Sequence, residues 1–328
     1  MRYLLLIGLV AIAAGCGGSA AATSTRAPAT PARQKVTIQL DWYPNPDHIG
    51  LYTAIDRGFF ARAGLSVDPV SPSDVSDAIK LVAAGRVDLG ISYEPELLFA
   101  QQQHIPAAAV AAIVPTALNS VIARTDRGIH SIADLRGKTV GEDGSASTDA
   151  YLTAVLRHAG LNPQTAVHRV NVGFNLVPAI LSGRVDAIIG GFQNIEGIEA
   201  ARERVHTAVF PVDHFGVPSY DELVLIANPS RMRSDPGYRS MVARFVHALS
   251  AATAWARRHP AAAVAVMDRE TYRDYKNIIA TSVPATLRLL HTTALDPAAW
   301  NRFGMWMYRA GLLKSRPDGA SLVWRGRL

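Results

Sequence analysis

The stretch Leu40–His48, with the sequence LDWYPNPDH, connects a short strand pattern to an apolar helical pattern. Two prolines fix the backbone of this connection, and Pro46 also restricts Asn45 to an extended conformation. Asp47 is expected to cap the helix that follows. The stretch therefore predicts a stiff strand-to-helix turn that carries the side chains of Trp42, Tyr43, Asn45 and His48.

This turn is expected at a position where α/β proteins bind ligands. In an open α/β sheet, ligands lie just beyond the carboxyl ends of the strands. A flat aromatic face beside an amide and an imidazole suits a small heteroaromatic ligand. The alternative is that Trp42 is ordinary core and Asn45 only a turn residue, since aromatic side chains usually serve packing. The turn alone leaves both interpretations open.

The amino terminus has the form of a targeting segment. Residues 1–16 contain Arg2, a short apolar run, and small residues before Cys16, which is typical of a secretory signal peptide. The small residues resemble a bacterial lipoprotein cleavage site, so Cys16 is the expected lipidation site and would anchor the protein to a membrane. Signal cleavage at another position is the alternative. Residues 17–34, rich in Ala, Ser, Thr, Pro and Gly, predict a flexible tether.

Composition limits the classes of function. Cys16 is the only cysteine, so we expect no disulfide, no cysteine metal site and no thiol nucleophile in the mature protein. The formal net charge is +6, but the basic residues are scattered without interleaved aromatic residues, which argues against a nucleic-acid partner. The rest of the 328 residues is long enough for two lobes with separate cores.

Beyond residue 35, strand and helix patterns alternate, which predicts an α/β fold with largely parallel sheets. The expected strands lie at 36–42, 65–70, 87–92, 107–114, 120–125, 138–142, 167–172, 186–191, 207–212 and 222–228. The expected helices lie at 47–62, 73–85, 94–103, 131–136, 147–159, 174–182, 195–204, 236–258, 261–268, 275–281, 284–291 and 297–312.

One internal similarity suggests that this pattern occurs twice. The segment Ala84–Ile91 (AGRVDLGI) matches Ser182–Ile189 (SGRVDAII). In each copy a glycine fits the left-handed position that ends a helix, and an aspartate is expected to hold the entry to a buried strand. The two copies predict two similar α/β lobes. The alternative is that joins between helix and strand simply resemble one another by chance.

Each repeated strand ends in a polar and aromatic cluster, Ser92–Glu94 in the first copy and Gly190–Glu196 in the second. Trp42, Tyr93 and Phe192 are expected to hold a ring between the lobes. The groups expected to bond its amino groups are Glu94, Asn194 and Glu196. The alternative is that the two glutamates are first-turn acids favoured by the helix dipole.

The segment Gly144–Asp149 begins the helix expected at 147–159. Its free backbone N–H groups and the hydroxyls of Ser145 and Ser147 favour an anion or a polar ligand edge, but either serine could simply cap the helix.

Two crossings between the lobes are expected, at Ser120–Arg124 and Ser219–Ile226, and paired extended segments of this kind form a hinge. The expected first lobe is 35–122 plus 221–328, and the second is 123–220. Tyr220, Asp221 and Glu222 are placed either facing the cleft or on the hinge surface.

These motifs resemble the NMT1/THI5-like family of substrate-binding proteins. The matching pieces are Leu40–His48 with Gly50 and Tyr52, Gly58–Phe60, Gly64–Leu65, Ala84–Asp88, Ile91–Glu94, Asp134–Gly141, Asn194 and Glu196. The resemblance covers roughly residues 36–258, and the first motif is the most specific.

The resemblance implies a two-lobed periplasmic-binding-protein fold of the second type, which delivers a small molecule to the permease of an ABC importer. It implies a monomer without cofactor or metal, on the extracytoplasmic face of the membrane, in the periplasm or at the cell surface. Relatives capture thiamine pyrimidine precursors such as formylaminopyrimidine, or riboflavin. An aromatic pair packs on the ring while Asn and Glu read its nitrogens, which maps onto Trp42, Asn45, Tyr93, Asn194 and Glu196, with Phe192 a weaker candidate.

Two other functions remain open at this point. A binding protein for an alkanesulfonate or nitrate would use Ser145, Ser147 and Thr148 at the helix start. An enzyme similar to the pyrimidine synthases of the same superfamily would need a cysteine-rich motif and a lysine for pyridoxal phosphate. The single cysteine, Cys16, disfavours the enzyme and makes His48 a turn or pocket residue. We therefore expect a binding protein with no catalytic residue.

Overall fold

The computed structural model describes residues 33–73, 77–173, 175–203, 205–271 and 273–326. The expected signal peptide, Cys16 and nearly all of the expected tether lie outside these residues. In the described part, no helix combines the length and the apolar character needed to cross a membrane.

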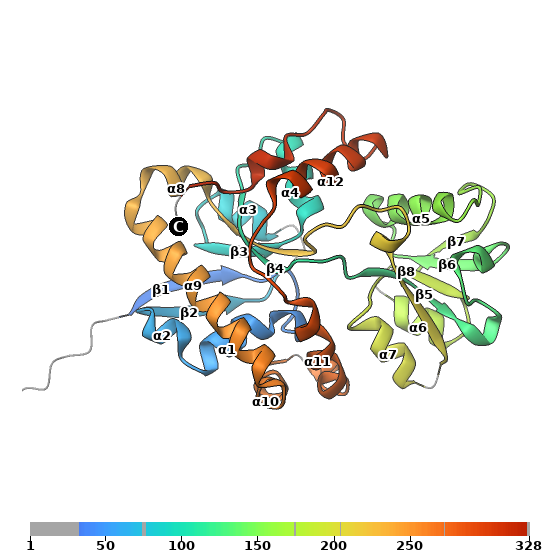
Figure 1. The fold of residues 1–328 in the computed structure, drawn as a ribbon, viewed down its shortest axis with the longest axis horizontal. Helices are drawn as coiled ribbons and strands as arrows, with labels where there is room; N and C mark the ends of the chain where they lie inside the picture. The colour runs from blue at the N-terminus through green and yellow to red at the C-terminus, as the bar shows by residue number, and fades with distance from the viewer. Residues whose placement is uncertain (1–32, 74–76, 174, 204, 272, 327–328) are drawn as a thin grey trace, which may run out of the picture. The chain divides into compact units, whose positions relative to one another are not determined.

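Ten strands form two five-stranded sheets (Figure 1). The first sheet has the order β2-β1-β3-β10-β4 and contains β1 (Gln34–Gln39), β2 (Leu65–Val70), β3 (Leu89–Ser92), β4 (Ala108–Val114) and β10 (Leu223–Ala227). The second has the order β7-β6-β8-β5-β9 and contains β5 (Asn119–Arg124), β6 (Thr139–Glu142), β7 (His168–Asn171), β8 (Ala187–Phe192) and β9 (Thr207–Pro211). All ten expected strands are present, within a few residues at their ends.

The two sheets have the same topology. In the first, β1 pairs in parallel with β2 and β3, and β10 lies antiparallel between β3 and β4. In the second, β6 pairs in parallel with β7 and β8, and β5 lies antiparallel between β8 and β9. The expected α/β fold is confirmed, but each sheet is mixed, with two parallel and two antiparallel pairings, and not largely parallel.

The repeated helix–Gly–strand unit is also confirmed in its details. Gly85 and Gly183 have φ values of +66° and +74°, a conformation that glycine adopts without the steric cost of a side chain. The carboxylate of Asp88 accepts from the backbone N–H of Thr37 at 3.1 Å. The carboxylate of Asp186 accepts from the N–H of Thr139 at 2.9 Å. Each aspartate therefore holds the start of its strand against the neighbouring parallel strand.

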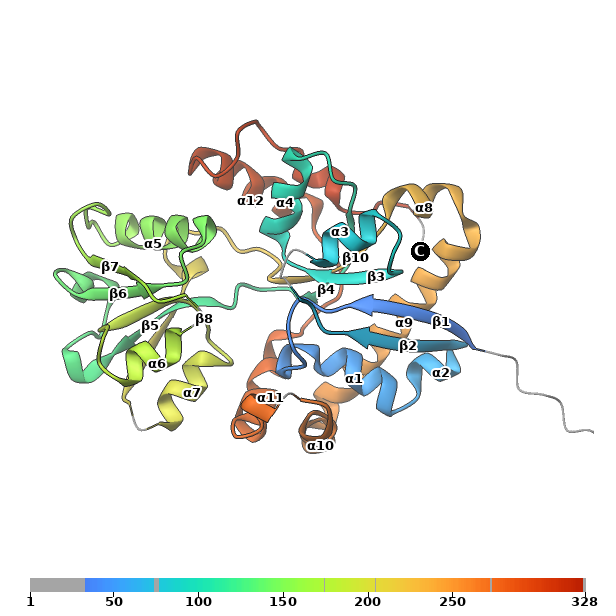
Figure 2. The same ribbon diagram turned by 180° about the vertical axis from the view of Figure 1, so that it is seen from behind.

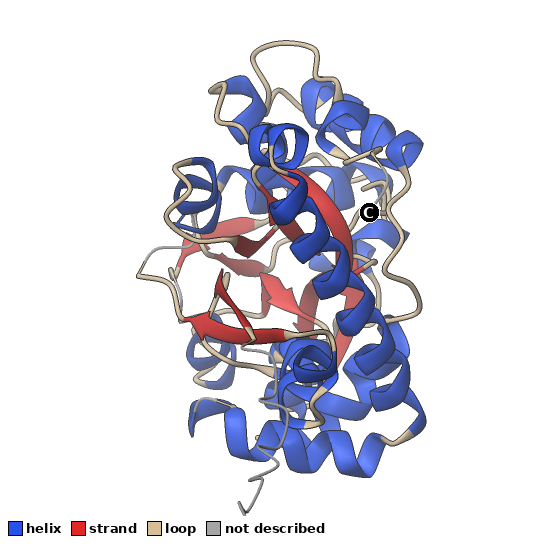
Figure 3. Cartoon of the chain, turned by 90° about the vertical axis from the view of Figure 1, so that its left-hand side faces the viewer, coloured by secondary structure: helices blue, strands red, loops and turns tan. Residues whose placement is uncertain are grey.

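Helices cover both faces of the first sheet (Figure 2). One face carries α1 (Ile49–Asp56), α2 (Phe59–Arg62), α9 (Pro236–Arg258), α10 (Pro260–Glu270) and α11 (Ile279–Leu289), and the other carries α3 (Asp77–Ala83), α4 (Glu94–Gln102) and α12 (Pro297–Arg309). The second sheet is flanked by α5 (Ala146–His158), α6 (Leu176–Leu181) and α7 (Glu196–Arg202). Figure 3 shows the strands enclosed between these helices.

Three helical expectations need correction. The helix expected at 47–62 is divided into a 3-10 turn at Pro46–His48, α1 and α2, because Gly58 has a φ of +70° between the two α-helices. The two helices expected on either side of residue 283 are one helix, α11, which contains Pro284. The short helix α8 (Pro229–Ser234) was not predicted; Asn228 caps it, and Pro229 starts it.

The chain passes between the sheets twice, through residues 115–118 and 212–222. All six residues of β5 belong to the second sheet, so the lobe boundary expected after residue 122 falls inside this strand. We propose that the second lobe begins at Asn119 instead. The carboxylate of Glu222, on the returning segment, accepts from the backbone N–H groups of Leu118 and Asn119 at 2.7 and 3.1 Å and so joins the two crossings.

Candidate functional site

A cavity of about 500 Å³ lies at the carboxyl ends of the parallel strands of both sheets. Its lining residues are Asp41, Trp42, Asn45, Tyr93, Pro95, Glu96, Asn119, Asp143, Ser145, Ser147, Thr148, Tyr151, Leu176, Val177, Pro178, Gly190, Phe192, Ile195, Glu196, Glu199, Glu222 and Tyr275. Six of the predicted site residues are brought together here, namely Trp42, Asn45, Tyr93, Ser145, Phe192 and Glu196. His48, Glu94 and Asn194 are not among the lining residues.

The turn after β1 is held by its own side chains. The side chain of Asn45 accepts from the N–H of Asp47 at 2.8 Å, while the N–H of Asn45 donates to Nδ1 of His48 at 3.3 Å. These two contacts form a reciprocal capping box around the 3-10 turn. The expectation that Asp47 is the cap is therefore wrong: Asn45 is the cap, because Pro46 keeps it extended.

Asp41 is a cavity residue that the sequence analysis missed. Its Oδ1 lies 2.8 Å from Nε2 of His48, and its Oδ2 accepts from the hydroxyl of Tyr93 at 2.8 Å. His48 is fully buried, so it supports Asp41 from behind and does not reach the ligand space. Burial, with the nearby Asp41 charge, raises the pKa of Tyr93 well above its ordinary value, so this hydroxyl remains a donor. The signal for Asp41 was its place directly after the first strand.

The aromatic part of the cavity is rigid. The indole Nε1 of Trp42 donates to the hydroxyl of Tyr275 at 2.9 Å, and both side chains line the cavity. Burial raises the pKa of Tyr275 to about 12, so this phenol is neutral at physiological pH. Phe192 contributes an aromatic ring from the second sheet. The cavity therefore offers aromatic rings from both sheets, as a planar ligand requires.

Glu196 lies in the first turn of α7 and lines the cavity. Its Oε2 accepts from the backbone N–H of Phe192 at 2.7 Å. Burial raises the pKa of Glu196 to about 7, and the hydrogen bond from Phe192 opposes this effect. The carboxylate is thus both a local cap and a ligand-facing acceptor.

Asn194 does not face the cavity, in contrast to the prediction. Its Nδ2 donates to Oδ1 of Asp47 at 2.6 Å and to Oγ1 of Thr286 at 2.7 Å, and the hydroxyl of Ser282 donates to its backbone carbonyl. All four residues are buried. Asn194 therefore connects the loop after β8 to the turn after β1 and to α11, and its amide N–H groups are not available to a ligand.

Glu94 is also buried away from the cavity. Its Oε2 accepts from the backbone N–H of Asp221 at 2.8 Å, which fixes the returning crossing to the start of α4. Burial raises its pKa well above the ordinary value. Of Tyr220, Asp221 and Glu222 on this crossing, only Glu222 is among the lining residues. The backbone N–H of Asp221 donates to Glu94, and its carboxylate accepts from the indole of Trp300 at 2.8 Å.

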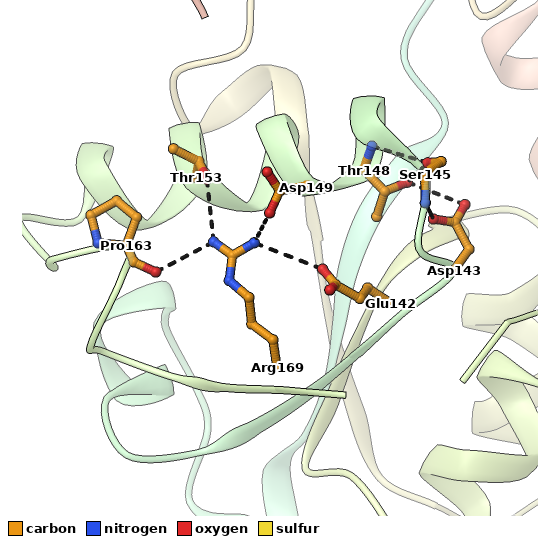
Figure 4. A network of polar contacts seen from close by, with 8 residues as sticks. All are labelled: Glu142, Asp143, Ser145, Thr148, Asp149, Thr153, Pro163 and Arg169. Atoms are coloured by element: carbon orange, nitrogen blue, oxygen red, sulfur yellow. Dashed lines mark hydrogen bonds and ion pairs between the residues drawn. The ribbon is translucent and has the colours of Figure 1, made fainter. Parts of the chain in front are cut away.

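Asp143 lies just before the start of α5 and accepts hydrogen bonds from residues there (Figure 4). Ser145 is the cap, since its Oγ accepts from the N–H of Thr148 at 3.2 Å. Asp143 accepts from the N–H of Ser145 at 2.8 Å and from the hydroxyl of Thr148 at 3.2 Å. The guanidinium of Arg169, in the same network, bonds to Asp149 and lies outside the cavity lining. The N–H of Ser145 and the N–H and hydroxyl of Thr148 are therefore already engaged by protein groups.

The charge of the cavity follows from its lining. Six carboxylates line it, and no Lys, Arg or His does so among the described residues. The carboxylates are Asp41, Glu96, Asp143, Glu196, Glu199 and Glu222. Such a surface attracts ligands that donate hydrogen bonds or carry positive charge and disfavours anions.

Two α/β lobes with the same topology, two crossings and a cavity at their strand ends define a two-lobed ligand-binding protein with the periplasmic-binding-protein fold of the second type. The structure of the alkanesulfonate-binding protein SsuA from Xanthomonas axonopodis pv. citri matches this fold with a TM-score of 0.67 at 17% identity, covering 91% of this chain and 100% of that one. A likeness at this identity concerns the fold alone.

The sequence comparisons give the family. Residues 45–263 match the model described as NMT1/THI5 like, and the chain belongs to this family. It is 38% identical over 229 residues to the putative thiamine biosynthesis protein of Haemophilus influenzae, covering 70% of this chain and 71% of that protein. It is 41% identical over 198 residues to the formylaminopyrimidine-binding protein of Halalkalibacterium halodurans, covering 60% of this chain and 59% of that protein.

Proposed function

We propose that this protein is the substrate-binding component of an ABC importer and captures an amino-substituted pyrimidine of the formylaminopyrimidine type. The observation that carries the proposal is the cavity itself, which combines aromatic rings from both sheets with six carboxylates and no cation among the described lining residues. An aminopyrimidine offers a flat ring for stacking and exocyclic N–H groups for carboxylates. The relative from Halalkalibacterium halodurans is named a formylaminopyrimidine-binding protein, which supports the same ligand class.

The cavity disfavours the alternative of an alkanesulfonate or nitrate ligand. That alternative needs free donors at the start of α5, but Asp143 already accepts from the N–H of Ser145 and the hydroxyl of Thr148. An anion would also be placed among several carboxylates, and like charges at close range repel.

We also propose that the protein binds without turnover. His48 is the residue that a comparison with the pyrimidine synthases would suggest as a reactive group. Its side chain is fully buried and paired with Asp41. A buried imidazole that already bonds through both nitrogens, to Asp41 and to the N–H of Asn45, has no free position for proton transfer to a ligand.

For location, we propose an extracytoplasmic position with lipid attachment at Cys16, which lies outside the described residues. Labelling cells with a clickable fatty acid tests this proposal. The wild-type protein should carry the label in the membrane fraction, and Cys16→Ser should release unlabelled protein. Label retained by the variant would contradict the anchor.

Isothermal calorimetry with formylaminopyrimidine, riboflavin and methanesulfonate tests the ligand class. The wild-type protein should bind the pyrimidine and not the sulfonate. Trp42→Ala should weaken pyrimidine binding at least about tenfold, because lost stacking costs about 1.4 kcal/mol. Trp255→Ala is the matched control, since Trp255 stacks on His259 away from the cavity, and it should leave the affinity unchanged. Tighter binding of methanesulfonate than of the pyrimidine would overturn the proposal.

A further inference from the structure

The end of the cavity nearest the two crossings contains polar atoms that lack partners. The hydroxyl of Tyr151 and the Oδ1 of Asn119 are buried in the cavity wall and have no hydrogen-bond partner within 3.5 Å among the described residues. Both residues line the cavity together with Glu222. Leaving a buried polar group unpaired costs about 1–3 kcal/mol, so such atoms in a cavity wall indicate that a partner arrives from outside the chain.

The hydroxyl of Tyr151 is held in a fixed position. Its ring stacks between Tyr220 and Trp306, with both centroids 5.8 Å away. The hydroxyl of Tyr220 donates to Oε2 of Glu222 at 2.9 Å, and it also interacts with Tyr151 as a hydrogen-bond donor. Neither contact supplies an acceptor for the hydroxyl proton of Tyr151, which is therefore the part of this group left for a ligand.

Asn119 is fixed with a defined orientation. Its Nδ2 donates to Oε1 of Glu222 at 3.3 Å, and its backbone N–H donates to Oε2 of the same carboxylate at 3.1 Å. This arrangement leaves Oδ1 as the unpaired acceptor. Among the described residues, Oε1 of Glu222 receives one hydrogen bond, from Asn119, so a second acceptor lies beside the first.

We propose that Asn119, Tyr151 and Glu222 form a subsite that binds an exocyclic amino group and the adjacent ring nitrogen of a heteroaromatic ligand. The amino group donates to Oδ1 of Asn119, beside the Glu222 carboxylate, and the hydroxyl of Tyr151 donates to the ring nitrogen. This inference rests on the proposed function and specifies which part of the ligand is read at the crossings. In this proposal, the ligand's amino group is bound near the two crossings, and Glu196 on the second lobe is a further acceptor.

Calorimetry at pH 8 with three probes separates the two contacts. The probes are 4-amino-2-methylpyrimidine, 2-methylpyrimidine without the amino group, and 3-methylaniline without ring nitrogens. Asn119→Ala should weaken the aminopyrimidine roughly tenfold and leave 2-methylpyrimidine unchanged. Tyr151→Phe should weaken both pyrimidines roughly tenfold and leave 3-methylaniline unchanged. Equal wild-type affinity for the two pyrimidines, or equal losses for all three probes, would overturn the subsite.

A thermal melt of the empty protein tests the subsite without any ligand. Tyr151→Phe removes an unpaired hydroxyl, so the unfolding midpoint should stay the same or rise. The matched control is Tyr238→Phe, whose hydroxyl donates to the carbonyl of Asp88 at 2.5 Å, and this variant should lose about 2–4 °C. An equal loss in both variants would show that Tyr151 is already paired and would refute the subsite. Wild-type protein that binds no pyrimidine would refute the proposed function, while the melt would still decide the subsite.

Discussion

Replacing Asp47 with Asn should remove much of the dependence of stability on pH. Asp47 is almost completely buried and accepts one hydrogen bond from Asn194, while its Oδ2 has no partner. Burial raises its pKa from the ordinary 3.8 to about 7, against the opposing effects of Asn194 and His48, while the Asp41 and Glu196 charges raise it further.

The sign of the effect follows from proton binding. Between about pH 4 and pH 7 the folded protein retains the Asp47 proton and the unfolded chain has released it, so stability falls as the pH rises. The difference between 3.8 and about 7, at about 1.4 kcal/mol for each pH unit, amounts to roughly 4 kcal/mol once the pH exceeds 7. Roughly 2–3 kcal/mol of this cost develops between pH 5 and pH 8.

Urea denaturation at pH 5 and pH 8 measures this difference. Asp47→Asn keeps an acceptor for Asn194 and adds an amide that does not ionise, so its stability should fall about 2–3 kcal/mol less than that of the wild type over this range. Asp134→Asn is the control. Hydrogen bonds from His130 and Ser131 lower the pKa of Asp134, so its titration is complete below pH 5. If Asp47→Asn and the wild type lost the same stability, the buried-acid argument would be refuted.

Two further predictions concern the second lobe. Burial raises the pKa of Glu196 to about 7, so wild-type affinity for a neutral aminopyrimidine should increase from pH 6 to pH 8 as the acceptor ionises. Glu196→Gln should abolish that increase and weaken amino-bearing ligands more than anionic ones in calorimetry, whereas the reverse order would favour a sulfonate-type site. Asn194→Ala leaves buried oxygens of Asp47 and Thr286 without a donor, so it should lower the free energy of unfolding by about 2–4 kcal/mol in urea titrations. A change below 0.5 kcal/mol would show that these contacts contribute nothing.

The strands could be predicted because local patterns determine them. Buried runs such as Leu89–Ser92 are apolar and bounded by glycine and polar residues, and the repeated Gly-Arg-Val-Asp unit marks the same join twice. The helix boundaries were less secure where one residue had two possible effects. Gly58 could continue or break a helix, and Pro284 lies inside α11 although a proline there disrupts the bond to the carbonyl four residues earlier.

Site residues could be predicted from the sequence where they follow the end of a predicted strand. Trp42, Tyr93 and Glu196 follow strands and line the cavity. Asn194 follows a strand as well, but the neighbouring loop geometry directs it to Asp47 and α11, and the sequence contains no signal of that contact. Tyr151 and Tyr275 lie on or near helices, far from any strand end, and three-dimensional folding alone brings them to the cavity.

The exchange of strands between the two halves has a consequence for how this chain acquires its structure. In the first sheet, β10 lies between β3 and the edge strand β4 but is more than a hundred residues further along the chain. β10 is the strand that pairs with both β3 and β4. The first sheet therefore cannot be completed until the chain has been made available as far as residue 227. A protein secreted amino end first would therefore remain incompletely folded until most of its length has crossed the membrane, which suits a translocation channel that accepts only unfolded chains.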